Sequence, residues 1–214
     1  MSFLSYKELI EEGDTVILYL SANSMHALRV VRTILNKNNE SVENVFQTTY
    51  GALKVANLVG KSFGSKVELT RGWAYVLHPT PELWTLTLPH RTQINYGTDI
   101  SMIVFQLEIG PGSLVVEAGT GSGSLTHALA RSVRPGGTVC TFDFHEQRVA
   151  VAKEEFDSHG LASVVEARHR DVCEHGFGQE LDGRADAIFL DLPHPWLVIK
   201  HALKAYKQSG KSNL

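Results

Sequence analysis

In the first part of the chain, hydrophobic and polar residues alternate over short stretches, as they do in β-strands. Residues 14–20 (DTVILYL), 73–77 (WAYVL) and 83–88 (LWTLTL) are rich in β-branched and aromatic residues, and glycines and prolines separate these runs. The polar residues 36–43 (NKNNESVE) predict an exposed loop. The pattern predicts a β-rich domain over residues 1–94, built as a small barrel or a curled sheet.

From residue 95 onward, short apolar runs alternate with stretches of helical periodicity. Strands are predicted at residues 113–118, 138–144, 163–167 and 185–190, and helices at residues 124–133, 147–159 and 195–207. Strands that alternate with helices of about a dozen residues indicate βαβ units and a parallel sheet. The fold class predicted for residues 95–214 is therefore α/β, as a Rossmann-like domain that follows the β-rich one.

Composition and charge limit the possible classes of protein. The chain has 214 residues, of which 43% are hydrophobic and 20% are charged, and its formal net charge is −3. The glycines have no period of three, and no apolar run approaches the about 20 residues of a membrane span, which excludes collagen-like, disordered and transmembrane chains. We expect no secretion signal in the polar N-terminus, no disulfide framework from two cysteines and no metal site. Nucleic-acid binding would need a local patch or a partner.

A glycine-rich segment, EAGTGSGS (residues 117–124), lies between the first predicted strand of the second domain and the helix that follows it. Gly119 permits a tight turn, Gly121 allows the close approach of a ligand, and Gly123 opens the helix with free N–H groups. A dinucleotide-binding motif would have glycine or alanine at the position of Ser124. Glu117 also disfavours a pyrophosphate and favours a cationic group, such as the ammonium of a methionine moiety.

Two acids follow the next predicted strands. Asp143 ends the second strand, where a carboxylate can accept hydrogen bonds from both hydroxyls of a ribose. Asp171 follows the third strand and can accept a hydrogen bond from the exocyclic amine of adenine. Each acid alone is equally consistent with an exposed residue at a strand end. Together with the glycine loop, they indicate a binding site for S-adenosylmethionine (SAM).

The segment DLPHPW (residues 191–196) follows the fourth predicted strand, and ligands of open α/β sheets bind beyond the carboxyl ends of the strands. Asp191 is predicted to hydrogen-bond the amino group of a flat heterocycle and to accept a proton from it. His194 and Trp196 are predicted to stack on this substrate or to line its pocket. The alternative is a strand that ends at a proline, followed by a packed tryptophan.

Several segments together resemble the catalytic subunits of the tRNA adenine-N1 methyltransferase family, most closely the eukaryotic ones. The match extends from residue 1 to about residue 204, apart from a longer loop near residues 36–57. The segments that carry the resemblance are FGSKV (63–67), WAYVLHPTPELWTLTLPHRTQI (73–94), EAGTGSGS (117–124), FDFHEQR (142–148) and residues 171–173, 176–178 and 185–196.

The resemblance implies a β-rich domain that contacts RNA or a partner, followed by a SAM-dependent methyltransferase domain. It implies methyl transfer from SAM to N1 of the T-loop adenine, adenine(58), within a nuclear heterotetramer that contains a related non-catalytic subunit. It places Asp191 against the target adenine. The residues that it implies for SAM binding are Gln93, Ile94, Asn95, Ser122, Gly123, Ser124, Asp143, Arg148, Asp171 and Val172.

The sequence departs from the family pattern at two residues and at its end. Relatives often carry glutamate at the position of Asp143 and an apolar residue at the position of Asn95. The polar tail QSGKSNL (208–214) follows the last predicted helix, whereas the sheet of family members continues beyond this point. We therefore expect a C-terminally shortened product whose methyltransferase domain is incomplete.

Two alternative functions remain open at this point. A protein isoaspartate methyltransferase has a similar glycine loop, although residues 191–193 and the long β-rich leader argue against it. A non-catalytic chain that binds only SAM or the partner subunit is the second alternative, and methyl transfer to tRNA would distinguish it from the enzyme. The glycine spacing disfavours an NAD-dependent dehydrogenase.

Overall fold

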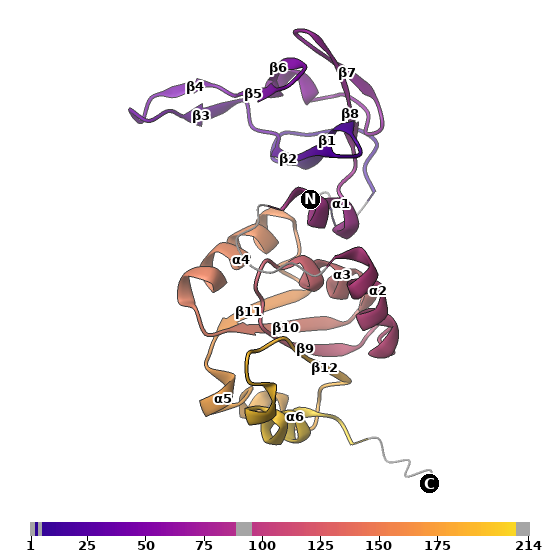
Figure 1. Ribbon diagram of the computed structural model, residues 1–214, viewed down its shortest axis with the longest axis vertical. Coiled ribbons are helices and arrows are strands. Elements are labelled where there is room, and N and C mark those ends of the chain that lie inside the picture. The colour runs from indigo at the N-terminus through magenta and orange to yellow at the C-terminus, as the bar shows by residue number, and fades with distance from the viewer. Residues whose placement is uncertain (1–2, 4–5, 89–95, 209–214) are drawn as a thin grey trace. The chain divides into compact units, whose positions relative to one another are not determined.

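Each of the two halves of the chain forms a sheet of its own. The computed structural model describes residues 3, 6–88 and 96–208 (Figure 1). Residues 1–89 with 158–160 form one compact unit, and residues 90–157 with 161–214 form the second. The boundary predicted after residue 94 lies outside the described residues, as do Gln93, Ile94 and Asn95.

The first unit is rich in β-strands, as its sequence pattern predicts, and these strands pair antiparallel. Its main sheet has the strand order β2-β1-β8-β7, and two hairpins accompany it. Alternation along β7 and β8 directs Val67, Leu69, Ala74 and Val76 into the core, where they pack with Leu18 of β1. The strands are β1 (Thr15–Ser21), β2 (Ser24–Arg29), β3 (Thr33–Leu35), β4 (Ser41–Glu43), β5 (Val45–Thr48), β6 (Gly51–Lys54), β7 (Lys66–Leu69) and β8 (Gly72–Leu77), and a 3₁₀ turn η1 (Val55–Leu58) follows β6.

The strand predicted at residues 83–88 is wrong, because these residues lie mostly in helix α1 (Pro81–Thr87). Pro81 occupies the first turn, where its fixed φ suits a helix. Thr80 caps the helix, since its side-chain oxygen accepts a hydrogen bond from the backbone N–H of Leu83 at 3.2 Å. The Thr-Pro-Glu start therefore outweighs the alternation of apolar residues and threonines that follows it.

The polar stretch at residues 36–43 is exposed, as predicted, but it is not only a loop. It includes β4 and the turn of a hairpin with β3, and every residue of both strands is exposed. Figure 1 shows this hairpin extending away from the main sheet of its unit.

The second unit is an α/β domain with a parallel sheet, which confirms the predicted fold class. The strand order is β11-β10-β9-β12. Figure 1 shows helices on both faces of this sheet, with α3 and α4 on one face and α5 and α6 on the other. The elements are α2 (Gly97–Gln106), β9 (Leu114–Ala118), α3 (Ser124–Ser132), β10 (Thr138–Asp143), α4 (Glu146–Ser158), β11 (Val165–His169), α5 (Val172–His175), η2 (Gln179–Leu181), β12 (Ala187–Leu190), η3 (Pro195–Leu197) and α6 (Ile199–Ala205).

Several helical elements of this unit differ from the sequence prediction. Helices α2 and α5 and the 3₁₀ turn η2 were not predicted, and the single helix predicted at residues 195–207 is instead the 3₁₀ turn η3 followed by α6. Within the described residues, no helix is long and apolar enough to cross a membrane.

Alternation along the parallel strands decides which side chains lie on each face of the sheet. Val116 and Ala118 of β9 pack with Phe142 of β10 in a core that includes residues of α5 and α6. Glu117 of β9 and Thr141 of β10 are register partners, and they alternate with these core residues and point to the opposite face. The glycine loop follows β9 directly, so the sheet holds the start of that loop in place.

Candidate active site

The carboxyl ends of the parallel strands meet at one edge of the sheet, where they surround a cavity of about 470 Å³. Ala118 at the end of β9 lies beside Phe142 of β10 and Leu190 of β12, so the residues that follow these strands become neighbours. The cavity is lined by Gly119, Phe142, Asp143, Phe144, Arg148, Arg170, Asp171, Val172, Cys173, Asp191, Leu192, Pro193 and His194.

Gly119 is required by its tertiary surroundings as well as by the turn. Its φ is +102°, and a Cβ added here would lie 2.2 Å from the carbonyl oxygen of Asp191. The two segments approach closely because the N–H of Asp191 donates to the carbonyl of Ala118 at 2.8 Å. The glycine loop and the segment after β12 therefore pack directly on each other, with no room for a side chain between them.

Asp143 lies at the centre of a network of hydrogen bonds. Its side chain is only 4% exposed, and its two oxygens accept from the backbone N–H groups of Gly121 at 3.3 Å and His145 at 2.9 Å. Arg148 lies 3.6 Å away. Burial raises the pKa of the Asp143 carboxyl, and Arg148 partly offsets this effect. The carboxylate is thus held rigidly at the cavity wall, while its remaining lone pairs can accept hydroxyl groups of a ligand.

Asp171 combines a structural contact with its place on the cavity. Its Oδ1 accepts from the N–H groups of Cys173 at 2.9 Å and Glu174 at 3.2 Å, which caps helix α5. Both cap bonds use the same oxygen, so the second oxygen is the one suited to a ligand amine. The next residue, Val172, lines the cavity with an apolar surface.

Glu117 does not line the cavity. Its side chain is 1% exposed, and Thr126 Oγ1 donates to its Oε2 at 2.6 Å. Burial raises the pKa of Glu117 to about 7, although the hydrogen bonds from Thr126 and Thr141 act in the opposite direction. Thr141 also contacts the hydroxyl of Thr120 in the glycine loop at 2.7 Å. The structure thus places Glu117 in a buried polar cluster, and its contact with an ammonium group stays a prediction.

Apart from Gly119, the other residues of the glycine loop do not line the cavity either. Ser122 Oγ accepts from the N–H of Ser124 at 3.3 Å, and Gly123 precedes α3 with a φ of +73°. His127 Nδ1 lies 2.7 Å from the carbonyl oxygen of Gly123 and donates to it, because that oxygen can only accept. Burial lowers the pKa of His127 to about 4, so this ring is neutral at physiological pH. It anchors the loop to the first turn of α3.

Two of the three predicted substrate residues line the cavity. Asp191 and His194 line the cavity, whereas Trp196 is 62% exposed and is not among the lining residues. The rings of His194 and Trp196 nevertheless lie near each other, with centroids 5.0 Å apart. Trp196 is therefore not a packed core tryptophan, in contrast to the alternative reading of this segment.

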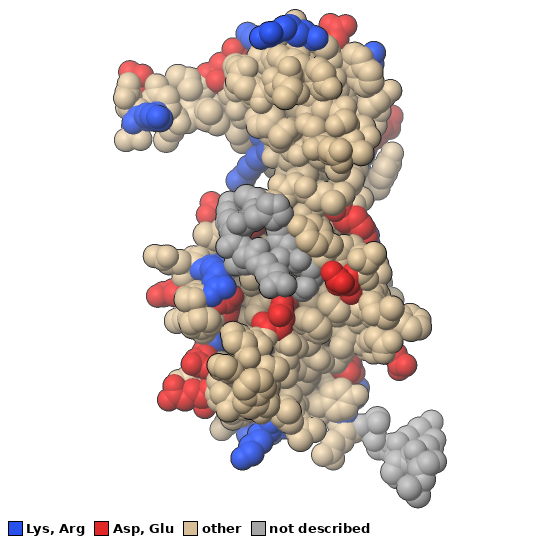
Figure 2. Space-filling model, in the orientation of Figure 1, with Lys and Arg blue, Asp and Glu red and all other residues tan. Residues whose placement is uncertain are grey.

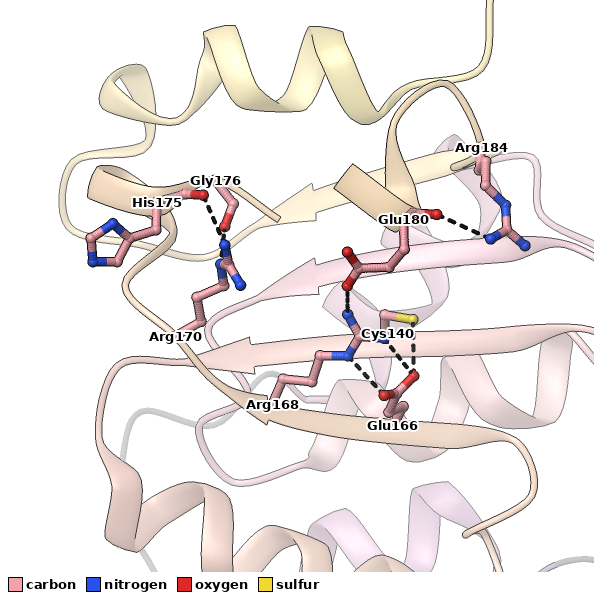
Figure 3. A network of polar contacts seen from close by, with 8 residues as sticks. All are labelled: Cys140, Glu166, Arg168, Arg170, His175, Gly176, Glu180 and Arg184. Atoms are coloured by element: carbon pink, nitrogen blue, oxygen red, sulfur yellow. Dashed lines mark hydrogen bonds and ion pairs between the residues drawn. The ribbon is translucent and has the colours of Figure 1, made fainter. Parts of the chain in front are cut away.

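Several cavity residues were missed from the sequence, notably Phe144 and Arg170. Phe144 is 55% exposed, and the guanidinium of Arg148 lies 5.5 Å from its ring centroid, so the two form a flat wall. Arg170 donates to the carbonyls of Gly176 at 2.8 Å and His175 at 3.1 Å, as Figure 3 shows. Phe144 follows Asp143 and Arg170 precedes Asp171, and this position beside a predicted site residue was the sequence signal that could have identified them.

The neighbouring Arg168 belongs to a different group of contacts. Figure 3 shows it between Glu166 and Glu180, both of which form ion pairs with it. The Arg168 charge is therefore already paired with two carboxylates, and Arg168 does not line the cavity. Among the described residues, no group of three or more His, Cys, Asp or Glu side chains is arranged to hold a metal ion.

Curated relatives share almost the whole chain. The catalytic subunit of tRNA (adenine(58)-N(1))-methyltransferase from Yarrowia lipolytica is 45% identical over 99% of this chain and 52% of its own length. The subunit of the same name from Candida albicans is 44% identical over 94% of this chain and 58% of its own length. The chain thus spans about half the length of the curated relatives it matches.

Two solved structures with the same fold are methyltransferases. A SAM-dependent O-methyltransferase from Thermotoga maritima superposes with a TM-score of 0.79 at 26% identity, over 95% of this chain and 71% of its own. The tRNA (m1A58) methyltransferase TrmI from Aquifex aeolicus superposes with a TM-score of 0.71 at 24% identity, over 93% of this chain and 72% of its own. These likenesses confirm the Rossmann-like methyltransferase fold, preceded by a β-rich region.

A family model covers the part of the chain that contains the site. The model of the tRNA methyltransferase complex GCD14 subunit matches residues 72–213, which include all four parallel strands and every cavity residue. The chain therefore belongs to the GCD14 family of tRNA methyltransferase complex subunits.

Proposed function

We propose that this chain is the catalytic subunit of a tRNA adenine-N1 methyltransferase, which transfers a methyl group from SAM to N1 of adenine 58. One observation carries the proposal: Asp143, Asp171 and Asp191, which lie at the carboxyl ends of three different strands, line one cavity with Gly119. The names of the curated relatives state this reaction for those proteins and support it here.

The residues of the cavity fit SAM as a cofactor. Asp143 offers a fixed carboxylate for the ribose hydroxyls, and Asp171 offers an oxygen for the adenine amine. Phe144 and Val172 supply apolar surface for a flat ring. Bound SAM supplies an activated methyl group on a sulfonium. The other cofactor contacts stay predictions, and these are Gln93, Ile94, Asn95, Glu117, Gly121, Ser122, Gly123, Ser124 and Arg148.

Asp191 is the catalytic residue in this proposal. Adenine N1 is a neutral nucleophile and the methyl group is already activated, so positioning supplies most of the rate acceleration. The Asp191 carboxylate accepts a hydrogen bond from the adenine amino group and thereby orients N1. Methylation leaves a cationic ring, and the same carboxylate stabilises this charge and accepts the proton that the amino group loses. His194 lines the cavity beside it, and Trp196 is proposed to stack on the base once it has left the tRNA stack.

The proposal extends to partners, domains and location. The family description, which names a tRNA methyltransferase complex, supports a tRNA substrate and a multi-subunit assembly. We infer that the partner is a related non-catalytic subunit in a heterotetramer, that the assembly is nuclear, and that the β-rich region before residue 95 contacts RNA or this partner.

The test is methyl transfer to two tRNA transcripts, one with adenine and one with guanine at position 58, by the chain together with its partner subunit. We expect N1-methyladenosine in the first transcript only. Asp191→Asn should lower kcat about 100-fold or more, because it removes the charge and the proton acceptor. SAM affinity, measured by calorimetric titration, should change less than about threefold, since the cofactor contacts remain.

Asp157→Asn is the matched control, because Asp157 is exposed and does not line the cavity. It should behave as the unmodified chain does. Loss of SAM binding in Asp191→Asn would instead assign Asp191 to the cofactor or to folding. SAM binding without methyl transfer, even with the partner present, would make this a non-catalytic chain.

A further inference from the structure

The main sheet of the first unit has one buried and one exposed face. Val67 and Leu69 of β7 and Ala74 and Val76 of β8 are buried in the core. The residues that alternate with them are exposed, and two of these are large aromatic side chains, Trp73 at 47% and Tyr75 at 39% exposure. The exposed residues in β7 and β8 are Lys66, Glu68, Trp73 and Tyr75.

The register of the strands brings these side chains together. Lys66 of β7 lies opposite Tyr75 of β8, which in turn lies opposite Tyr19 of β1. The rings of Trp73 and Tyr75 are 5.3 Å apart at an interplanar angle of 77°. The Lys66 ammonium lies 4.2 Å from the centroid of the Trp73 ring. We call this surface, formed by Tyr19, Lys66, Trp73 and Tyr75, the aromatic face.

Lys66 is the cation of the aromatic face, and together with the rings it favours a ligand that has flat groups and a negative charge. Within the described residues, Lys66 forms no ion pair with a carboxylate, so its charge is available to a phosphate. On the view in Figure 2, acidic and basic side chains are interspersed over both units, without one extended basic surface. For a chain with a formal net charge of −3, we expect RNA binding on the aromatic face to use stacking together with a few local cations.

We propose that the aromatic face binds unpaired nucleotides of an RNA by stacking bases on Trp73 and Tyr75, with Lys66 contacting a phosphate. This inference rests on the proposed function, which makes tRNA the RNA concerned. Every base has a π-face, and side chains of this kind recognise loops and ends, where bases are not paired. Glu68 lies on the same side of the sheet opposite Trp73, and its charge opposes the approach of a phosphate.

The experiment measures the affinity of the full chain for a tRNA transcript and for a single-stranded oligonucleotide by fluorescence anisotropy. Trp73→Ala should weaken binding of both at least about fivefold, while Trp73→Phe should remain within about twofold because it keeps a ring. Tyr6→Ala removes a tyrosine that is 83% exposed elsewhere in the unit, and it should have no effect.

The charged residues provide a second, independent readout. Lys66→Gln should weaken binding and reduce its salt dependence, whereas Lys61→Gln, which removes another exposed lysine, should change neither. Glu68→Gln should strengthen RNA binding, because it removes a repulsive charge. A strengthened complex after this change cannot result from partial unfolding.

The outcomes separate this inference from the proposed function. SAM affinity and kcat at saturating tRNA should be unchanged in Trp73→Ala, with the loss confined to RNA affinity and to KM for tRNA. RNA binding that depends on Trp73 in a chain that never methylates tRNA would overturn the proposed function alone. Unchanged RNA affinity in Trp73→Ala, or a wild-type chain that binds no RNA, would overturn the inference. If Trp73→Ala abolished binding of the partner subunit but left RNA affinity unchanged, the inference would also be overturned, and this face would be a protein interface.

Discussion

The two sheets of this chain bring side chains together in different ways. In the parallel sheet, β9, β10, β11 and β12 all run in one direction, so the residues that follow them meet at a single edge. In the antiparallel sheet, neighbouring strands end at opposite edges, so side chains from several strands meet on a face instead. Tyr19, Tyr75 and Lys66 are such a set. Strand direction thus decides whether a cavity at the strand ends or an open surface can form.

Burial differs between the sheets in the same way. The parallel sheet has helices on both faces, and even Glu117 in β9 is 1% exposed. The β7–β8 hairpin of the antiparallel sheet keeps one face exposed, with Trp73 at 47%. In the parallel sheet, burial therefore shifts the pKa of a charged group such as Glu117. In the antiparallel sheet, an aromatic ring such as that of Trp73 remains accessible.

The largest effect that we expect concerns the edge of the parallel sheet. Gly119→Ala would place a Cβ 2.2 Å from the backbone of Asp191 at a positive φ, so the loop or the segment after β12 must move. We expect destabilisation of about 3 kcal/mol or more and loss of measurable SAM binding, observed by thermal unfolding and calorimetric titration.

Gly112→Ala is the control for this change, because Gly112 also has a positive φ, +84°, but nothing lies within 4 Å of the added Cβ. It should cost only about 1–2 kcal/mol and leave SAM binding intact. Equal effects in the two variants would show that backbone strain alone, rather than the contact with Asp191, requires Gly119.

An intermediate effect should come from the buried carboxyl of Glu117. Its pKa rises from an ordinary value of 4.5 to about 7 in the folded chain, so the folded state holds its proton more tightly than the unfolded state. Stability is therefore highest below pH 4.5 with respect to this group, falls as pH rises toward 7, and has lost about 3 kcal/mol above that value. Glu117→Gln should remove this decline, as measured by denaturant unfolding between pH 5 and 8.

The exposed Glu154 of α4 supplies the comparison for this titration. Glu154→Gln should keep the decline of stability with pH, because it leaves the buried Glu117 carboxyl in place. If Glu117→Gln and the unmodified chain have the same pH dependence, the Glu117 carboxyl is not held in the buried cluster with Thr126.

The smallest effect concerns the helix at the end of the first unit. Thr80→Ala removes the side-chain acceptor of the Leu83 N–H and should lower stability by about 1 kcal/mol, whereas Thr80→Ser keeps the acceptor and should be nearly neutral. Thermal unfolding measures both. If residues 83–88 formed a strand instead, neither variant would differ from the unmodified chain.

The sequence predicted the second unit better than the first. In the second unit, each βαβ repeat combines an apolar run, a glycine or an acid at its end and a helical period, and these local signals agree. In the first unit, short strands and threonine-rich helices have similar patterns, and residues 83–88 were assigned to the wrong class. The hairpin of β3 and β4 was also missed, since its residues are exposed on all sides and have no apolar periodicity.

Local sequence patterns also predicted only part of the candidate site. Asp143, Asp171 and Asp191 were found because each lies at or near the carboxyl end of a predicted strand, and the cavity includes all three. Phe144 and Arg170 were missed, although they adjoin two of these acids, because an exposed aromatic or a cation has many possible roles. Glu117 was assigned to a ligand, and only the structure places it with Thr126 and Thr141.

The sequence by itself determined the α/β class of the second unit, the β-rich class of the first, the glycine loop and the acids at the strand ends. These features depend on periodicity and turn chemistry, which act over a few residues. The tertiary structure alone decided that Gly119 packs against Asp191, that Glu117 is buried, and that Lys66 lies over Trp73. Such contacts depend on which strands pair and in which register, and these pairings join residues that local patterns do not relate.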